Sequence, residues 1–230
     1  MELVSTGIEG LDQMMGGGIP KGHVVTVLGS FGTGKTTFGL QFLIEGLSRG
    51  EKGIFITLEE DPMSVNANAA SFGWDLSPHV KDRKLSLIKL EPSDAKATVL
   101  KVKSELPQFI KKFGAQRIVI DSISLLSMMF PDDIERRTRL FNLCNQIRTT
   151  DATCLLTAES KDNDSRSSRD GLVEYVSDGV ISLRFHQGES QAVQLVLQVI
   201  KMRRLAHLRD PKPYSIANNG IEVHSEIEVF

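Results

Sequence analysis

Cysteine, net charge and long apolar runs are all scarce in this chain of 230 residues. Its two cysteines, Cys144 in a helical pattern and Cys154 in a strand pattern, suit small buried residues in a reducing compartment. They suit this role better than a disulfide framework, and they give no support to a cysteine metal site. A formal net charge of −2 argues against a surface built as a whole for nucleic acid.

No stretch has the length and composition of a membrane span. The first residues lack a basic segment followed by an apolar one, and the longest apolar stretch, residues 118–130, is interrupted by Asp121 and several serines. We therefore expect a soluble, cytoplasmic protein that does not contact a membrane. No internal repeat is apparent, and the length suits a single α/β domain over residues 1–230.

Apolar runs of strand length alternate with helical patterns through the first two thirds of the chain. Such runs are typical of strands covered on both faces, and the alternation predicts a mainly parallel central sheet flanked by helices. Strands are expected at residues 24–28, 54–58, 85–90, 118–120 and 154–157, and helices at 38–47, 99–113 and 140–147.

The two ends of the chain have different patterns. Thr6 and Glu9 form a capping-box pattern that predicts a short helix over residues 8–15. After residue 176, short strand-like runs separated by turn residues predict antiparallel strands that extend the same sheet. The polar segment 160–171 has no periodicity, so we expect a mobile surface loop there.

Residues 29–36, GSFGTGKT, match the phosphate-loop motif G-x-x-x-x-G-K-[ST] between an apolar strand and a helical pattern. A glycine-rich turn in this position points backbone N–H groups inward, where they and the helix dipole can bind a polyphosphate. Lys35 is placed to reach the outer phosphates, and the Thr36 hydroxyl to ligate their Mg²⁺. The residues expected to bind the nucleotide are Gly29, Ser30, Phe31, Gly32, Thr33, Gly34, Lys35, Thr36 and Thr37.

Residues 117–121, RIVID, form an apolar strand pattern that ends in a carboxylate. This is the arrangement expected of a Walker B aspartate, which holds Mg²⁺ directly or through water. An aspartate after a strand can also cap the following loop, but the phosphate loop favours the metal role. Thr36 and Asp121 are therefore the predicted metal-site residues.

Glu59, Glu60 and Asp61 follow the expected strand at 54–58, at the sheet edge where ligands of open α/β sheets bind. One glutamate can orient or deprotonate the attacking water, and charge repulsion would raise the pKa of one carboxyl group. If both lay on the strand, only one would face the nucleotide. A solvated acidic turn before Pro62 is the alternative. We find no Asn-Lys-x-Asp element of the kind used for guanine, so ATP is the expected nucleotide.

Longer segments accompany these motifs: STGIEGLDQMMGGGIPKG at 5–22, FITLEED at 55–61, RIVIDS at 117–122, EYVSDGVISL at 174–183 and KMRRLAH at 201–207. Together with the phosphate loop, they resemble the KaiC-like branch of the RecA-type ATPases, particularly its single-domain archaeal members. The resemblance extends from Ser5 to about Val223. It implies a RecA-like P-loop NTPase core.

In that family the paired glutamates are the catalytic carboxylates, which implies this role for Glu59 and Glu60. Its members form rings, commonly hexamers, with ATP between subunits, and a Lys-x-Arg element reaches the γ-phosphate of the adjacent protomer. Lys201 and Arg203 correspond to that element, and such a cation can be worth roughly 10³ to 10⁵ in rate. Without the resemblance, KMRR would indicate an ordinary basic strand end. Arg204 and Leu205 depart from the small residues expected after the arginine.

The leading hypothesis is a Mg²⁺-dependent ATPase whose nucleotide state controls ring assembly and contacts with a protein partner. Lys35, Glu59, Glu60, Lys201 and Arg203 would be its catalytic residues. Clock members of the family phosphorylate a Ser-Thr pair where this chain has Glu174 and Tyr175. We therefore expect hydrolysis without that autokinase cycle.

Two other hypotheses remain open at this point. The chain could be a recombinase-like module that binds single-stranded DNA through arginines, with Phe130 as the stacking residue. The candidate arginines are Arg136, Arg137, Arg139, Arg166 and Arg169. It could also be a signalling scaffold that binds ATP and hydrolyses it slowly, because turnover depends on sub-ångström placement of water and cations.

Overall fold

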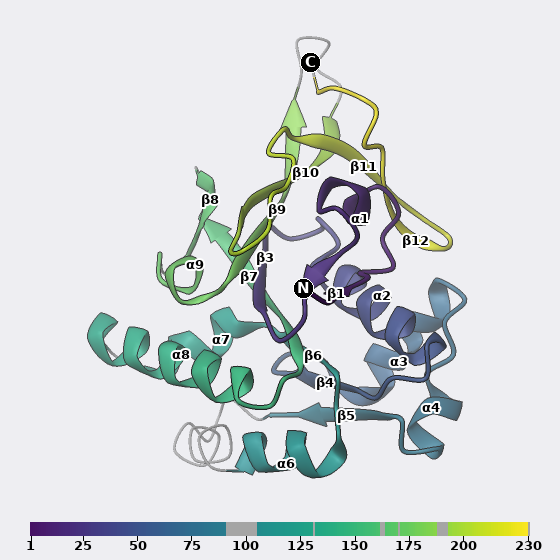
Figure 1. Ribbon diagram of the computed structural model, residues 1–230, viewed down its shortest axis with the longest axis vertical. Helices are drawn as coiled ribbons and strands as arrows, with labels where there is room; N and C mark the ends of the chain where they lie inside the picture. Colours follow the sequence, from purple (N-terminus) through teal and green to yellow (C-terminus); the bar gives the residue numbers. More distant parts are fainter. Residues whose placement is uncertain (91–104, 131, 162–163, 170, 188–192, 230) are drawn as a thin grey trace.

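The computed structural model describes residues 1–90, 105–130, 132–161, 164–169, 171–187 and 193–229. A ten-stranded sheet runs through the molecule, with helices on both faces (Figure 1). Its strand order is β12-β11-β10-β9-β3-β7-β6-β4-β5, and β8 pairs with β7 outside this path. Strands β1 and β2 form a separate two-stranded sheet near the N-terminus.

The strands are β1 (Leu3–Val4), β2 (Ile19–Pro20), β3 (Val24–Gly29), β4 (Gly53–Thr57), β5 (Leu85–Lys89), β6 (Arg117–Asp121), β7 (Thr153–Lys161), β8 (Asp164–Ser168), β9 (Gly179–Gln187), β10 (Val193–Met202), β11 (Lys212–Ala217) and β12 (Gly220–Val223). The helices are α1 (Leu11–Met14), α2 (Lys35–Ser48), α3 (Pro62–Ser71), α4 (Ser77–Lys81), α6 (Leu106–Phe113), α7 (Ile123–Met128), α8 (Asp133–Arg148) and α9 (Val173–Val176).

The middle of the sheet is parallel and its C-terminal part is antiparallel, so the predicted α/β class is confirmed. Strands β5, β4, β6, β7, β3 and β9 run parallel to their neighbours in the sheet. The antiparallel pairs begin where β10 joins β9 and continue through β11 and β12. The change therefore comes one strand later than the sequence pattern indicated, since β9 is still parallel to β3.

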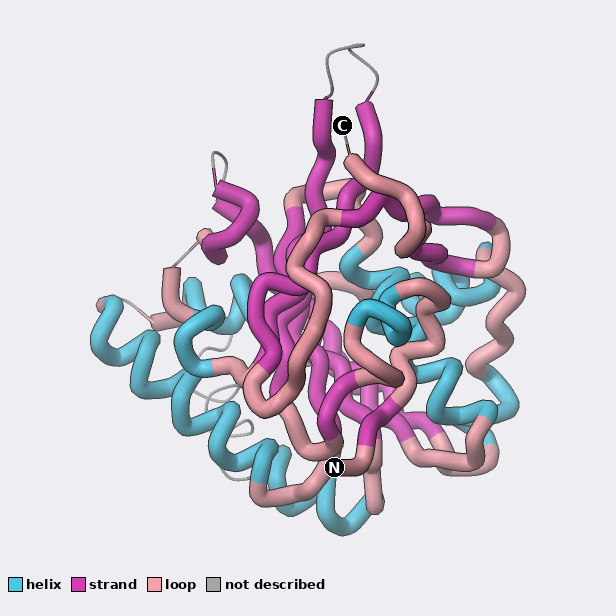
Figure 2. The backbone as a smooth tube through the Cα atoms, turned by 45° about the horizontal axis from the view of Figure 1, so that its top comes forward, coloured by secondary structure: helices cyan, strands magenta, loops and turns pink. Residues whose placement is uncertain are grey.

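Alternate residues of the central strands pack into two separate cores. Val25 and Val27 contact the core under α2 and α3, whereas Val24 and Leu28 contact the core under α7 and α8. Figure 2 shows helices on both sides of the strands. Because both faces are covered, these strands are continuous apolar runs in the sequence, which is why their positions could be predicted.

Both cysteines are buried and free of disulfides, as expected. Burial raises the pKa of the Cys144 thiol to about 12, so it remains protonated at neutral pH. In the part of the chain that the structure describes, no helix is long and apolar enough to span a membrane.

The short helix predicted over residues 8–15 is present as α1, but the predicted capping box is wrong. Helix α1 begins at Leu11 after Gly10, which has a positive φ of 80° and provides no side-chain cap. Thr6 instead donates its N–H and hydroxyl to the Asp12 carboxylate, at 2.9 and 2.7 Å to Oδ1. The Asp12 carboxylate of α1 therefore accepts hydrogen bonds from the loop that precedes the helix and fixes its position.

The prediction of a mobile loop over residues 160–171 is also wrong for the described residues. Strand β7 continues to Lys161, and β8 folds back on it in antiparallel pairing. Figure 1 shows β8 at the margin of the molecule, where residues beyond the core need no apolar periodicity. The predicted helix over 99–113 is present as α6 from Leu106, and its first residues lie outside the described part of the chain.

Candidate nucleotide-binding site

The loop between β3 and α2 exposes a row of backbone amides. Gly32 and Gly34 have positive φ values of 75° and 85°, which turn the chain toward the start of α2. Among the described residues, the N–H groups of residues 32–36 have no hydrogen-bond acceptor. Open amides at the N-terminus of a 14-residue helix form a site for an anion such as a phosphate chain.

Contacts from inside the molecule hold this loop. The Thr33 hydroxyl and Lys35 Nζ both donate to the Ser30 carbonyl oxygen, at 2.8 and 2.9 Å. The hydroxyl of buried Tyr214 on β11 donates to the Thr33 carbonyl at 2.6 Å. Burial lowers the pKa of Lys35, and the nearby Asp121 carboxylate opposes that shift. The lysine thus lies over its own loop, at the place where phosphates would bind.

Thr36 and Asp121, the predicted metal-site residues, are in direct contact. The Thr36 hydroxyl at the start of α2 donates to Asp121 Oδ2 at the end of β6, at 2.7 Å. Thr157 on β7 donates its hydroxyl to the other carboxylate oxygen. Hydroxyl and carboxylate oxygens are the ligands that Mg²⁺ prefers. Among the described residues there is no cluster of three His, Cys, Asp or Glu that could hold a metal ion, so Mg²⁺ here would also need phosphate oxygens.

Glu59 and Glu60 lie on a turn just beyond β4, not on the strand. Strand β4 ends at Thr57, whose hydroxyl accepts the N–H groups of Glu59 and Glu60 at 3.2 and 2.9 Å. The rule that neighbours on a strand face opposite ways therefore does not apply. Asp61 instead caps α3, accepting from the N–H groups of Met63 and Ser64.

The two glutamates have different surroundings. Burial raises the pKa of Glu60, and the negative charges of Asp121 and Glu59 raise it further. Glu59 is more exposed, and its Oε1 accepts a hydrogen bond from the Ser122 hydroxyl at 3.4 Å. Both carboxylates are thus close to the Thr36–Asp121 contact, and Glu60 is the one whose environment most disfavours its charge.

Lys201 and Arg203 lie at the opposite edge of the sheet. Met202 is in register with Gly179, and Gly179 with Val25 near the start of β3, whereas the phosphate loop begins at Gly29. The four residue steps of extended strand from Val25 to Gly29 separate the two edges by about 13 Å. Within one chain, the structure therefore does not bring these cations to the phosphate loop.

At this amino edge, where the parallel strands begin, both cations donate hydrogen bonds to oxygen atoms of α9 or of the residues that follow it. Lys201 Nζ donates to the carbonyl oxygens of Glu174 and Ser177 at 2.8 and 2.7 Å. Arg203 donates to Asp178 Oδ1 at 3.3 Å. Burial and the charge of Arg203 lower the pKa of Lys201.

Asp178 connects this cluster to the sheet. It accepts from the Val24 N–H at 3.0 Å and from Arg148 Nε at 2.9 Å. Burial alone would raise its pKa, but the hydrogen bonds from Arg148 and Val24 hold the pKa of Asp178 below its usual value. Sequence reasoning did not single out Asp178, although it lies within the quoted segment EYVSDGVISL; the supporting hydroxyls Thr157 and Tyr214 had no signal in the sequence.

The arginines proposed for DNA contacts are mostly engaged within the chain. Arg136 donates to the carbonyl oxygens of Ser127 and Phe130, and Arg139 pairs with Glu135 at 2.9 Å. Phe130, the predicted stacking residue, is only 6% exposed. That assignment is wrong, because the ring belongs to the core under α7 and α8.

Comparison with known proteins agrees with this geometry. A protein-family model described as "ATPase: KaiC" matches residues 4–228. The chain belongs to the KaiC family of ATPases. A crystal structure of a KaiC-like protein from the archaeon Pyrococcus horikoshii OT3 aligns over 97% of this chain and 99% of that one, with a TM-score of 0.86 and 31% identity.

Curated relatives are longer than this chain. The circadian clock oscillator protein KaiC of Prochlorococcus marinus is 34% identical over 230 residues, which cover 97% of this chain and 45% of that protein. The KaiC protein of Parathermosynechococcus lividus is 35% identical over 227 residues, covering 95% of this chain and 41% of that protein. The chain thus spans less than half the length of these relatives.

Proposed function

We propose that this protein is a Mg²⁺-dependent ATPase that works as a homo-oligomeric ring, with ATP bound between neighbouring subunits. The observation that carries the proposal is the division of the site between two sheet edges. Open amides, Lys35, Thr36, Asp121 and the two glutamates gather at one edge, and Lys201 and Arg203 lie at the other.

The carboxyl edge suits the binding of ATP with its metal. The amides of residues 32–36 would hold the β- and γ-phosphates, and Lys35 would leave the Ser30 carbonyl for a phosphate oxygen. Thr36 and Asp121 would hold Mg²⁺ together with phosphate oxygens. The metal would neutralise charge on the phosphates when bound.

The glutamates suit activation of the attacking water. An ionised carboxylate beside the γ-phosphate can accept a proton or orient the water, and a raised pKa makes it a better base near neutral pH. Glu60 has that raised pKa. Glu59, which accepts from Ser122, would help to position the same water.

The cations at the amino edge are suited to neutralise charge on the phosphoryl group during transfer. Because Lys201 and Arg203 lie at the sheet edge opposite the phosphate loop of their own chain, about 13 Å away along the strands, they would act on the nucleotide of the next subunit. Head-to-tail contacts of this kind repeat around a closed ring, and a hexamer is the form we propose. There the cations would neutralise charge on the transferring phosphoryl group.

We further propose that residues 1–230 act as one domain, and that the protein is cytoplasmic and regulatory, with hydrolysis changing the ring and its contacts with a protein partner. Since neither Glu174 nor Tyr175 reproduces a Ser-Thr pair, the proposed reaction ends at hydrolysis. Intact mass after incubation with Mg-ATP should show no stoichiometric phosphate, and such uptake would contradict this point.

Size-exclusion chromatography with light scattering, run with and without Mg-ATP and coupled to phosphate release, tests the proposal. We expect ATP and Mg²⁺ together to produce a ring and phosphate release, and Lys35→Ala to abolish release. An isolated subunit that hydrolyses ATP as fast as any assembly would overturn the proposal. DNA binding gains no support, because Arg136, Arg139 and Phe130 are used inside the molecule.

A further inference from the structure

Phe31 is exposed in an unusual place. Its side chain is 89% exposed, the largest fraction among the large hydrophobic residues that the structure describes. A single exposed hydrophobic residue is ordinary on a protein surface. Phe31, however, is the third residue of the loop whose amides are open, between Ser30 and Gly32. Any surface that covers the phosphates of ATP would therefore meet this ring as well.

A second aromatic side chain accompanies it. Phe185, at the outer part of β9, is 47% exposed. Its Cζ lies 3.7 Å from the point that a Cβ would occupy if Gly32 carried a side chain. The mouth of the loop thus combines amides for an anion with two apolar rings at its side. Once a triphosphate occupies the amides, a partner that fits this mouth must offer positive charge and an apolar surface next to each other.

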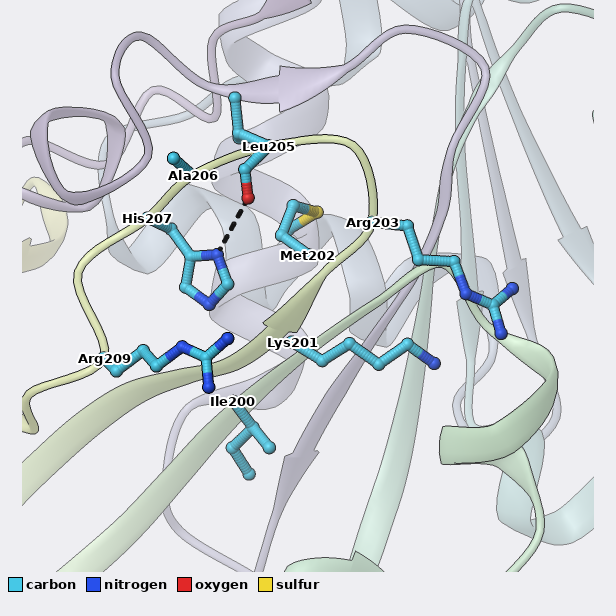
Figure 3. Close-up of a pocket in the computed structure, with 8 residues that line it drawn as sticks. All are labelled: Ile200, Lys201, Met202, Arg203, Leu205, Ala206, His207 and Arg209. Carbon is cyan, nitrogen blue, oxygen red and sulfur yellow. Dashed lines mark hydrogen bonds between the residues drawn. The ribbon is translucent and has the colours of Figure 1, made fainter.

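The amino edge of the sheet offers such a surface. A hollow of about 500 Å³ lies between the end of β10 and the segment that follows it. Figure 3 shows Ile200, Met202 and Leu205 around it, with the Lys201 and Arg203 side chains extending to one side. Apolar side chains and the two cations therefore come from the same short stretch of chain.

We propose that Phe31 of one subunit packs into this hollow of the next subunit, beside Lys201 and Arg203, and so links subunit contact to the loop that holds the phosphates. The inference rests on the proposed ring, because only a second copy brings this hollow to the phosphate loop. Burial of an aromatic ring near the centre of an interface is a common source of binding energy. The phosphates and the ring would then be recognised together.

A photoreactive phenylalanine analogue, p-benzoylphenylalanine, at position 31 tests this contact. Isotope-labelled and unlabelled subunits are mixed and irradiated with Mg-ATP, and the adducts are mapped by mass spectrometry. We expect adducts to residues 200–209 of a different subunit. A ring that forms without such adducts, or with adducts only inside one chain, overturns the inference and leaves the proposed function standing. Failure of the unmodified protein to form a ring overturns both.

Assembly provides a second readout that does not need cross-linking. Phe31→Ala should raise the subunit concentration at which half of the protein is assembled by about tenfold, the usual loss for an interface anchor, and Phe31→Leu should recover most of it. Phe141→Ala, which removes a 50% exposed ring from α8, is the matched control. Assembly of Phe31→Ala at the wild-type concentration would contradict the proposal, as would an equal shift for Phe141→Ala.

The same photoreactive variant can be irradiated in the presence of a single-stranded oligonucleotide, to test whether Phe31 contacts nucleic acid instead of a second subunit. Exposed aromatic rings can also stack on bases. If the analogue at position 31 reacted with the oligonucleotide in preference to residues 200–209, the contact proposed here would be wrong.

Discussion

At the carboxyl edge of the sheet, the described polar groups are amide donors without acceptors and carboxylates close to one another, whereas at the amino edge two cations lie on carbonyl oxygens and a carboxylate. At the first edge the described residues give these amides no anion to bind, and Lys35 lies near the carboxylates. The second has cations that are already engaged. A triphosphate would supply acceptors for the amides of the first edge and a new partner for the cations of the second.

This difference shows why a complete set of motifs in one sequence need not form a complete site in one subunit. Lys201 lies at the end of β10 and Arg203 directly follows it, and β10 runs antiparallel to β9 and so returns to the amino edge. The fold itself thus separates the cations from the phosphate loop. Contact between copies is the arrangement that brings the halves together in our proposal.

The largest effect should come from removing the cation at the amino edge. Arg203→Ala should lower the ATP turnover of the assembled protein by roughly 10³-fold or more, because charge on the transferring phosphoryl group would lose its partner. Arg204→Ala, which removes the neighbouring exposed arginine, is the control and should turn over near the wild-type rate. Steady-state phosphate release measures the turnover of both variants. Wild-type turnover by Arg203→Ala would contradict the proposal that the site is divided between the two sheet edges.

Removing a carboxylate at the other edge should have the next largest effect. Glu60→Gln should reduce turnover by roughly 10² to 10⁴-fold, the range for loss of a positioned base. Glu59→Gln, which keeps the same size, should reduce it less because Glu59 is more exposed. Single-turnover kinetics with bound ATP separate this loss from weaker binding. A larger loss for Glu59→Gln would reverse our assignment of the base.

The pH dependence of turnover should report the environment of Glu60. Its carboxyl group must be ionised to act as a base, and its raised pKa means that protonation begins at a higher pH than for an ordinary glutamate. Turnover should therefore fall as the pH decreases through that raised pKa, about tenfold per pH unit below it. A rate that stays constant down to the usual glutamate pKa would contradict a base in this environment.

The smallest predicted effect concerns the support beneath the phosphate loop. Tyr214→Phe removes the hydroxyl that donates to Thr33 at 2.6 Å and should lower the free energy of unfolding by about 1 kcal/mol. Tyr175→Phe is the matched control, since Tyr175 is 67% exposed. Urea denaturation of both variants makes the comparison. Equal stability of the two variants would show that the Tyr214 contact does not hold the loop.

The central strands and the phosphate loop could be predicted because their signals are local. Runs such as 24–28 are apolar on both faces, and the loop motif stands between a strand and a helix. Strand β8 could not be predicted, since beyond the core its polar residues carry no apolar pattern. The position of Thr6 depends on Asp12, a contact that competes with the capping pattern.

The candidate site was predictable in part. Thr36 and Asp121 are 85 residues apart in sequence, yet each ends or begins an element at the same edge, so their contact follows from the order of strands. The buried Arg117 was not expected as a structural residue. It is 1% exposed, donates to Glu51 and lies over the ring of Phe42. Such a contact between distant elements leaves no mark in the sequence pattern.

Complementation between two inactive variants tests the central claim most directly. Lys35→Ala lacks the phosphate contact, and Arg203→Ala lacks the cation for its neighbour, so each alone should be inactive in phosphate release. In an equal mixture, the account predicts that roughly a quarter of the head-to-tail interfaces recover both groups, with a matching part of wild-type turnover. A mixture no more active than the sum of its parts, in rings shown to contain both variants, would contradict a site shared between subunits.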